Sequence, residues 1–141
     1  MKVVLDTNVL VSALLNPFGP PARVFDLLMT GNLQLTFDDR ILAEYREVLA
    51  RPRFGFDLDD VGELLEYLQV GGELVAASPL SNPLPDPDDE PFLEVAVAAR
   101  VEALITGNIR HYPVETRQGI SILPPSEFMA WWQSRQQAKD E

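Results

Sequence analysis

The sequence predicts a single α/β domain, a three-layer α/β/α sandwich around a central parallel sheet. Short apolar, β-branched runs alternate with longer amphipathic segments, which is the pattern of β-α-β units with helices on both faces of a parallel sheet. A length of 141 residues suits one domain. We therefore expect residues 1–141 to form one unit, with a peripheral C-terminal helix at about residues 126–138.

The composition narrows the possible chemistry. Hydrophobic residues make up 46% and charged residues 23% of the chain, as in folded globular proteins. The absence of cysteine excludes disulfides, thiolate zinc sites and a cysteine nucleophile, and a single histidine excludes a multi-histidine site. No apolar run reaches the roughly 18 residues of a membrane span, and no signal-peptide pattern begins the chain, so we expect a cytoplasmic protein without a membrane contact.

The first elements follow from apolar runs and their stop signals. Lys2–Leu5 predicts a buried strand, which leads through a turn into a helix over residues 9–15. Residues 16–21 hold three prolines and one glycine, and a second helix is expected over residues 21–30, ending at Gly31.

The central elements are marked by caps and prolines. Residues 33–36 predict a second strand, and a helix capped by Asp38 or Asp39 runs to about Ala50 because Pro52 follows. Beyond these, an amphipathic helix is expected over residues 57–70 and a short strand over residues 73–76.

The last elements follow a loop with four prolines at residues 78–89. A helix over residues 90–101 tolerates Pro91 in its first turn. Strands are expected at residues 103–106 and 120–123, and a final helix capped by Ser126.

Two acidic residues stand at positions where such folds place their sites. Asp6 directly follows the first strand, and sites in parallel sheets open at the carboxyl ends of the strands. Glu44 lies three residues after Ile41 and four before Val48, beside the apolar stripe of its helix. Alone, Glu44 fits a surface ion pair as well as a site.

A third acidic segment leads into the helix over residues 90–101. Its acids are Asp86, Asp88, Asp89 and Glu90, and Asp89 points along the buried face because Phe92 and Leu93 follow three and four residues later. One acid suffices to cap a helix. Crowded carboxylates repel one another, and a divalent cation with oxygen ligands offsets that cost.

The net charge of −11 is concentrated in one part of the chain. Residues 57–102 hold twelve acids and only one base, Arg100, whereas the flanking segments are balanced. Nine of the eleven bases are arginines, which suit bidentate contacts with phosphate, so an acidic total does not exclude a nucleic-acid substrate.

Four short segments occur in the same order as in a known family: VLDTNVL at residues 4–10, LAEY at residues 42–45, DPDD at residues 86–89 and LITGN at residues 104–108. With these segments, the chain resembles the PIN-domain family and, within it, the VapC-like toxins of prokaryotic type II toxin–antitoxin pairs. The resemblance implies a ribonuclease that depends on Mg²⁺ or Mn²⁺, acts on RNA, forms a homodimer and is inhibited by a cognate antitoxin protein.

The resemblance also assigns roles to individual residues. Asp6, Glu44 and Asp89 would be catalytic metal ligands, and Asp86 an additional acid. Thr7, Asn8 and Thr106 would orient the carboxylates or a water on the metal, and Arg110 and His111 could contact the RNA or form an ordinary exposed loop. Asn108 stands where the family often has a fourth Asp. It brings an amide oxygen but no charge, so the number of metal ions in the site, one or two, stays open.

Two other classes of protein fit parts of the pattern. A phospho-acceptor receiver domain or an aspartate-nucleophile phosphatase needs a lysine after a late strand, but the only lysines are Lys2 and Lys139. A PIN-like module that binds RNA or a protein without turnover is the stronger alternative, supported by Asn108 and opposed by the retention of Asp6, Glu44 and Asp89.

Overall fold

The computed structural model describes residues 1–140. Within them, five parallel strands form one sheet in the order β3-β2-β1-β4-β5. The strands are β1 (Lys2–Leu5), β2 (Gln34–Phe37), β3 (Glu73–Leu74), β4 (Ala103–Ile105) and β5 (Ile122–Leu123). The helices are α1 (Thr7–Leu15), α2 (Pro20–Met29), α3 (Asp39–Leu49), α4 (Leu58–Gly71), α5 (Glu90–Ala99) and α6 (Pro125–Asp140). Short 3₁₀ turns are η1 (Pro52–Phe54), η2 (Pro87–Asp89), η3 (Ile109–His111) and η4 (Val114–Thr116).

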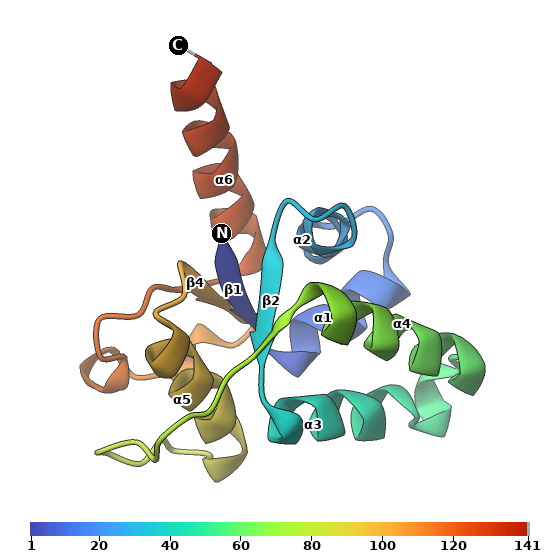
Figure 1. Cartoon of the computed structure of the whole chain (residues 1–141), viewed down its shortest axis with the longest axis horizontal. Coiled ribbons are helices and arrows are strands. Elements are labelled where there is room, and N and C mark those ends of the chain that lie inside the picture. The colour runs from blue at the N-terminus through green and yellow to red at the C-terminus, as the bar shows by residue number, and fades with distance from the viewer. Residues whose placement is uncertain (141) are drawn as a thin grey trace.

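The helices cover both faces of the sheet, which confirms the predicted α/β/α sandwich (Figure 1). Helix α5 packs against β1, β2 and β4 on one face, and α1, α2 and α4 lie on the other. Helix α3 lies beyond the carboxyl end of β1, whereas α6 projects from the opposite end of the molecule. In residues 1–140, no helix has the length and apolar character needed to cross a membrane.

In the neighbouring strands β1 and β4 every residue except Lys2 is buried, as their apolar runs predict. Leu5 of β1 pairs with Ile105 of β4, and both are at most 1% exposed. The backbone N–H of Asp6 donates a 2.9 Å hydrogen bond to the carbonyl of Ile105. This register brings Asp6 and Thr106, which directly follow the two strands, to neighbouring positions at the carboxyl edge of the sheet.

The structure corrects several element boundaries. Helix α1 begins at Thr7 rather than at Val9, and Asp38 is the cap of α3, since its carboxylate accepts from the backbone N–H of Ile41 at 3.1 Å. The prediction that Ser126 caps the last helix is wrong, because α6 begins one residue earlier at Pro125. Proline suits the first turn of a helix, where its missing N–H would have no intrahelical partner.

The 3₁₀ turns were not predicted, because three residues are too few to show a hydrophobic period. Strand β5 is also shorter than expected and begins at Ile122. Gln118 and Gly119 both have positive φ angles, of 53° and 82°, so the chain is still turning just before this strand.

Candidate functional site

A cleft of about 420 Å³ opens at the carboxyl edge of the sheet. It is lined by residues from the end of β1, the start of α1, α3, η1, η2 and the segment after β4. The charged and polar residues that line it are Asp6, Thr7, Asn8, Ser12, Glu44, Arg51, Arg53, Asp86, Asp88, Asp89, Asn108 and His111. The three acidic segments singled out in the sequence therefore meet in one cleft.

Asp6 is the most deeply buried acid of the cleft, with 5% of its surface exposed. Its Oδ2 atom accepts two hydrogen bonds, at 2.9 Å from the hydroxyl of Thr106 and at 3.0 Å from the hydroxyl of Tyr112. Burial raises the pKa of Asp6 above its ordinary value, and these two hydrogen bonds act in the opposite direction. The two hydroxyls thus stabilise a carboxylate whose surroundings favour the neutral acid.

Glu44 faces Asp6 from helix α3 and is half-buried. The hydroxyl of Thr7 donates a hydrogen bond to Oε2 of Glu44, which links the first residue of α1 to α3. Burial raises the pKa of Glu44, this hydrogen bond lowers it, and the negative charges of Asp6 and Asp88 raise it further. Glu44 is therefore a residue of the cleft, whereas Glu47 points outward and pairs with Arg51 at 2.8 Å.

Asp89 contributes the third carboxylate from the end of η2, where α5 begins. It is 9% exposed, and its buried Oδ2 atom accepts no hydrogen bond from any group in residues 1–140. Nδ1 of His111 lies 3.2 Å from this oxygen without the geometry of a hydrogen bond. Burial, followed by the charge of Asp6, raises the pKa of Asp89 to about 6.

The other acids of this segment have different surroundings. Asp86 is exposed, lines the cleft and caps η2 by accepting from the backbone N–H of Asp88 at 2.9 Å. Glu90 turns away from the cleft and accepts from the backbone N–H of Leu84 at 2.9 Å, which fixes the proline-rich loop. Asp86 is thus placed near the site, while Glu90 has a structural role.

The polar residues named from the sequence tie the cleft together. Oδ1 of Asn8 accepts from the backbone N–H of Gly107 at 2.8 Å, and the hydroxyl oxygen of Thr106 accepts from the N–H of Asn108 at 3.0 Å. A Cβ atom on Gly107 would lie 3.1 Å from Oδ1 of Asn8, so a side chain there would press on this contact. Asn8 thus holds the turn after β4 rather than a carboxylate.

Asn108 and His111 line the cleft, but Arg110 does not lie among the residues that line it. Both Arg110 and His111 are exposed. The sequence grouped the two as possible contacts to RNA, and the structure brings only His111 against the acidic groups, 3.2 Å from Asp89.

Tyr112 is a residue of the site that sequence reasoning missed. It is fully buried, and its hydroxyl donates to Asp6. The guanidinium of Arg117 donates at 2.8 Å to the carbonyl of Tyr112 and so holds this loop. The available signal was a large aromatic residue with a polar end in an irregular segment, since a buried tyrosine needs a partner for its hydroxyl.

The oxygen atoms of the cleft are of the type that binds a hard divalent cation, because Mg²⁺ and Mn²⁺ prefer carboxylate and amide oxygens as ligands. The unpartnered, buried Oδ2 of Asp89 also fits an added cation. As the side chains stand in residues 1–140, however, no three His, Asp or Glu groups are arranged to hold one ion. Thr7 engages Glu44, and Thr106 and Tyr112 engage Asp6.

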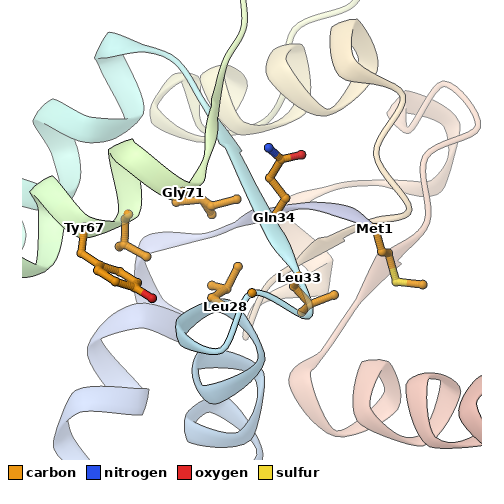
Figure 2. A pocket seen from close by; sticks show the side chains of 9 residues that line it. Met1, Leu28, Leu33, Gln34, Tyr67 and Gly71 are labelled. Carbon is orange, nitrogen blue, oxygen red and sulfur yellow. The ribbon is translucent and has the colours of Figure 1, made fainter.

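A second cavity, of about 360 Å³, lies at the opposite edge of the sheet, between α2, β2 and α4. Figure 2 shows Leu28, Leu33, Gln34, Tyr67 and Gly71 around it, and the hydroxyl of Tyr67 donates at 2.7 Å to the carbonyl of Met29. None of the residues that line it carries a carboxylate or a basic side chain. It therefore lacks the groups for the chemistry expected of the acidic cleft.

Comparison with known families identifies the class of protein to which this fold and site belong. Residues 2–110 match the PIN domain family, and the chain belongs to this family. PIN domains are generally nucleases, so the membership indicates the nuclease class of hydrolases. The family assignment made from the sequence is confirmed.

Two further comparisons show a similar sequence and a similar fold. The chain is 32% identical over 111 residues to the uncharacterized protein MJ1680 of Methanocaldococcus jannaschii, a match covering 77% of this chain and 71% of that protein. The fold of the present chain matches a chain in the structure of VapBC-1 from nontypeable Haemophilus influenzae, with a TM-score of 0.59 and 18% sequence identity. The match covers 89% of the present chain and 99% of the other.

Proposed function

We propose that this protein is a divalent-metal-dependent ribonuclease that hydrolyses phosphodiester bonds of RNA, and that it is the toxin of a toxin–antitoxin pair. The observation that carries the proposal is the meeting of Asp6, Glu44 and Asp89 in one cleft, although they come from three distant parts of the chain. Burial raises the pKa of each of these carboxyl groups. The charge of Asp6 also raises the pKa values of Glu44 and Asp89, and the charge of Glu44 raises that of Asp89. A cluster of this kind stores repulsion that a bound cation relieves.

The proposed cofactor is Mg²⁺ or Mn²⁺, with Asp6, Glu44 and Asp89 as the residues that would hold it and Asp86 as an additional acid at the mouth. When bound, such an ion supplies a nucleophile at neutral pH and stabilises negative charge on the phosphoryl oxygens. Asn108 lines the same cleft and offers an amide oxygen without charge. The donor set therefore favours one ion over two.

The neighbouring residues would orient these acids for binding the ion. Thr106 and Tyr112 hold Asp6 by one oxygen, and Thr7 holds Glu44 by one oxygen, so each carboxylate keeps a second oxygen for a ligand. Such supporting hydrogen bonds orient carboxylates and tune their basicity. His111 beside Asp89, together with the neighbouring Arg110, is proposed to contact the RNA backbone.

A protein partner is the second part of the proposal. The family resemblance and the fold shared with a chain of the VapBC-1 structure support a cognate antitoxin that covers the acidic cleft, and a homodimeric toxin. An antitoxin with a basic side chain would meet several carboxylates in the cleft, three of them with raised pKa values.

The alternative is a PIN-like module that binds RNA or a protein with little or no turnover. It is favoured by the uncharged Asn108 and by the absence, among the side chains of residues 1–140, of three groups already arranged around one ion.

Cleavage of a labelled single-stranded RNA by purified protein in Mn²⁺, Mg²⁺ or EDTA separates the two functions. We expect metal-dependent cleavage by the wild type and by Asp26→Asn, a control at an exposed position on α2, and no cleavage by Asp6→Asn. Asp6→Asn should remain folded, because it removes a charge whose burial is unfavourable. Equal cleavage by Asp6→Asn and wild type would contradict the proposed site.

A further inference from the structure

The turn η1 forms one rim of the acidic cleft. Arg51, Arg53 and Phe54 all line the cleft, as do the acids of η2. The turn is short and well held, since the N–H of Phe54 donates to the carbonyl of Arg51 and the N–H of Gly55 to that of Pro52, both at 3.1 Å. Gly55 has a φ of +68°, a conformation that favours glycine, so the chain reverses directly after Phe54.

Arg53 and Phe54 form a cation–aromatic pair on this rim. The guanidinium carbon of Arg53 lies 4.7 Å from the centroid of the Phe54 ring. The ring of Phe54 in turn stacks on that of Phe56, with centroids 5.8 Å apart and an interplanar angle of 19°. Arg53 is exposed while both rings are half-buried, so the guanidinium is the outer member of a stack anchored in the protein.

The two arginines of the turn differ in their pairing. Arg51 is engaged by Glu47, through hydrogen bonds of 2.8 and 3.2 Å. Arg53 has no carboxylate within 4.0 Å in the part of the chain that the structure describes, although the cleft beside it is lined by five acids. A planar cation that is held over an aromatic ring and left unpaired is suited to a ligand with both a flat π-face and a negative charge.

A nucleotide with an unpaired base has both of these features. Unpaired bases stack on aromatic rings and on guanidinium planes, and their phosphates pair with arginine, whereas bases inside a duplex keep their faces covered. We infer that Arg53 and Phe54 form a subsite that stacks one unpaired RNA base beside the acidic cleft and so selects single-stranded RNA. The inference rests on the proposed function and assigns the contact with an unpaired base to these two residues.

The test measures binding without cleavage. The probes are a fluorescein-labelled single-stranded RNA of mixed sequence and the same strand annealed to its complement, both in EDTA and followed by fluorescence anisotropy. We expect wild type to prefer the single strand, and Arg53→Gln and Phe54→Leu each to weaken its binding by about tenfold while duplex binding changes less. Phe54→Tyr should restore the affinity, because it keeps an aromatic ring.

Salt dependence distinguishes a contact with RNA from a structural effect. Arg53→Gln should lower the slope of log affinity against log salt by about one, whereas Arg53→Lys should keep the slope but lose part of the affinity. The chain provides a matched control on α6, where Arg135 lies 5.2 Å from the ring centroid of Trp131 and outside the cleft. Arg135→Gln and Trp131→Leu should bind RNA as the wild type does.

The outcomes separate this inference from the proposed function. Wild-type affinity for RNA in both Arg53→Gln and Phe54→Leu would overturn the inference, even if Asp6→Asn abolishes cleavage. A protein partner would then be the remaining candidate for binding at this rim. Weakened binding in these variants, with no metal-dependent cleavage by wild type, would support the subsite and contradict the nuclease. Arg53→Gln alters an exposed side chain, so it keeps the test decisive if Phe54→Leu lowers the stability of the fold.

Discussion

The hydroxyl of Tyr112 donates a 3.0 Å hydrogen bond to Oδ2 of Asp6, a residue 106 positions earlier in the chain. Both side chains are buried, and their contact joins the loop after β4 to the end of β1. Burial and the nearby charge of Asp6 raise the pKa of Tyr112 well above its ordinary value, so its proton stays in place at neutral pH. Tyr112 is thus a fixed donor to the most buried acid of the cleft.

Tyr112→Phe should weaken the site while preserving the fold. The variant keeps the buried ring but removes a hydrogen bond to a carboxylate, which costs about 1.5–3 kcal/mol. The pKa of Asp6 should rise further, and metal affinity or cleavage should fall by at least about tenfold, as for other supporting partners of metal ligands. Urea unfolding and the cleavage assay measure the two effects.

Tyr67→Phe is the matched control for this change. The hydroxyl of Tyr67 donates to the carbonyl of Met29 at the opposite edge of the sheet, where it lines the cavity of Figure 2. Its loss should leave cleavage unchanged. If both variants reduce cleavage to the same extent, the contact between Tyr112 and Asp6 has no particular role in the site.

The raised pKa of Asp89 makes folding stability depend on pH. Burial and the neighbouring charges raise this pKa from 3.8 to about 6 in the folded protein, so between these values the folded state binds more protons than the unfolded state. The stability contributed by this group is fully present below about pH 3.8 and is lost as the pH rises through 6. In EDTA at pH 7.5, Asp89→Asn should therefore be more stable than wild type, by about 1–3 kcal/mol.

Urea unfolding in EDTA at pH 4.5 and 7.5 measures this difference. The advantage of Asp89→Asn over wild type should shrink at the lower pH, and the exposed control Asp26→Asn should show no comparable change. If Asp89→Asn is less stable than wild type at both pH values, the carboxylate of Asp89 is stabilised in the folded protein. This result would contradict the prediction, which is based on a buried Oδ2 atom without a hydrogen bond.

The sequence predicted most of the fold, because its signals are local. The three apolar residues of β1 and the alternation of strands and helices were sufficient for the parallel sheet and its layers. Asp6, Glu44 and Asp89 were found because each stands at a strand end or beside a buried helical stripe. The structure places all three in one cleft, whereas their role as metal ligands stays a prediction.

The missed parts of the site lie where no periodicity exists. Tyr112 follows the turn η3, and its partner Asp6 is distant in sequence, so nothing local links them. Phe54 and Arg53 belong to the three-residue turn η1, which is too short to show a hydrophobic period. Irregular segments are positioned by tertiary contacts, and residue type alone therefore gave little information about them.

Gly72 is expected to be indispensable for joining α4 to the sheet. A Cβ atom at this position would lie 2.7 Å from the carbonyl oxygens of Leu35 and Leu68 and from the ring of Phe37, and the two backbone atoms cannot move easily. Gly72→Ala should therefore lower the free energy of unfolding by about 1–3 kcal/mol or more. At the neighbouring Gly71, no atom lies within 4 Å of an added Cβ, so Gly71→Ala should change stability by at most about 0.5 kcal/mol. Urea unfolding of both variants checks the comparison, and equal stabilities would contradict the close approach.

Asn108→Asp should strengthen metal binding and lower the stability of the metal-free protein. Asn108 is exposed at the cleft, and its backbone N–H is fixed by Thr106, so a carboxylate there would face the charges of Asp6 and Asp89. In EDTA this added repulsion should lower the melting temperature.

In Mg²⁺ or Mn²⁺, Asn108→Asp should show a larger rise in melting temperature than the wild type shows. The reason is that an ion that binds only the folded state stabilises that state more when it binds more tightly, and the extra carboxylate tightens binding. Asn82→Asp, in the exposed proline-rich loop, adds the same charge outside the cleft and should leave the response to metal unchanged. A response in Asn108→Asp no larger than in Asn82→Asp would show that position 108 does not contact the ion and that the uncharged amide is not what limits metal binding.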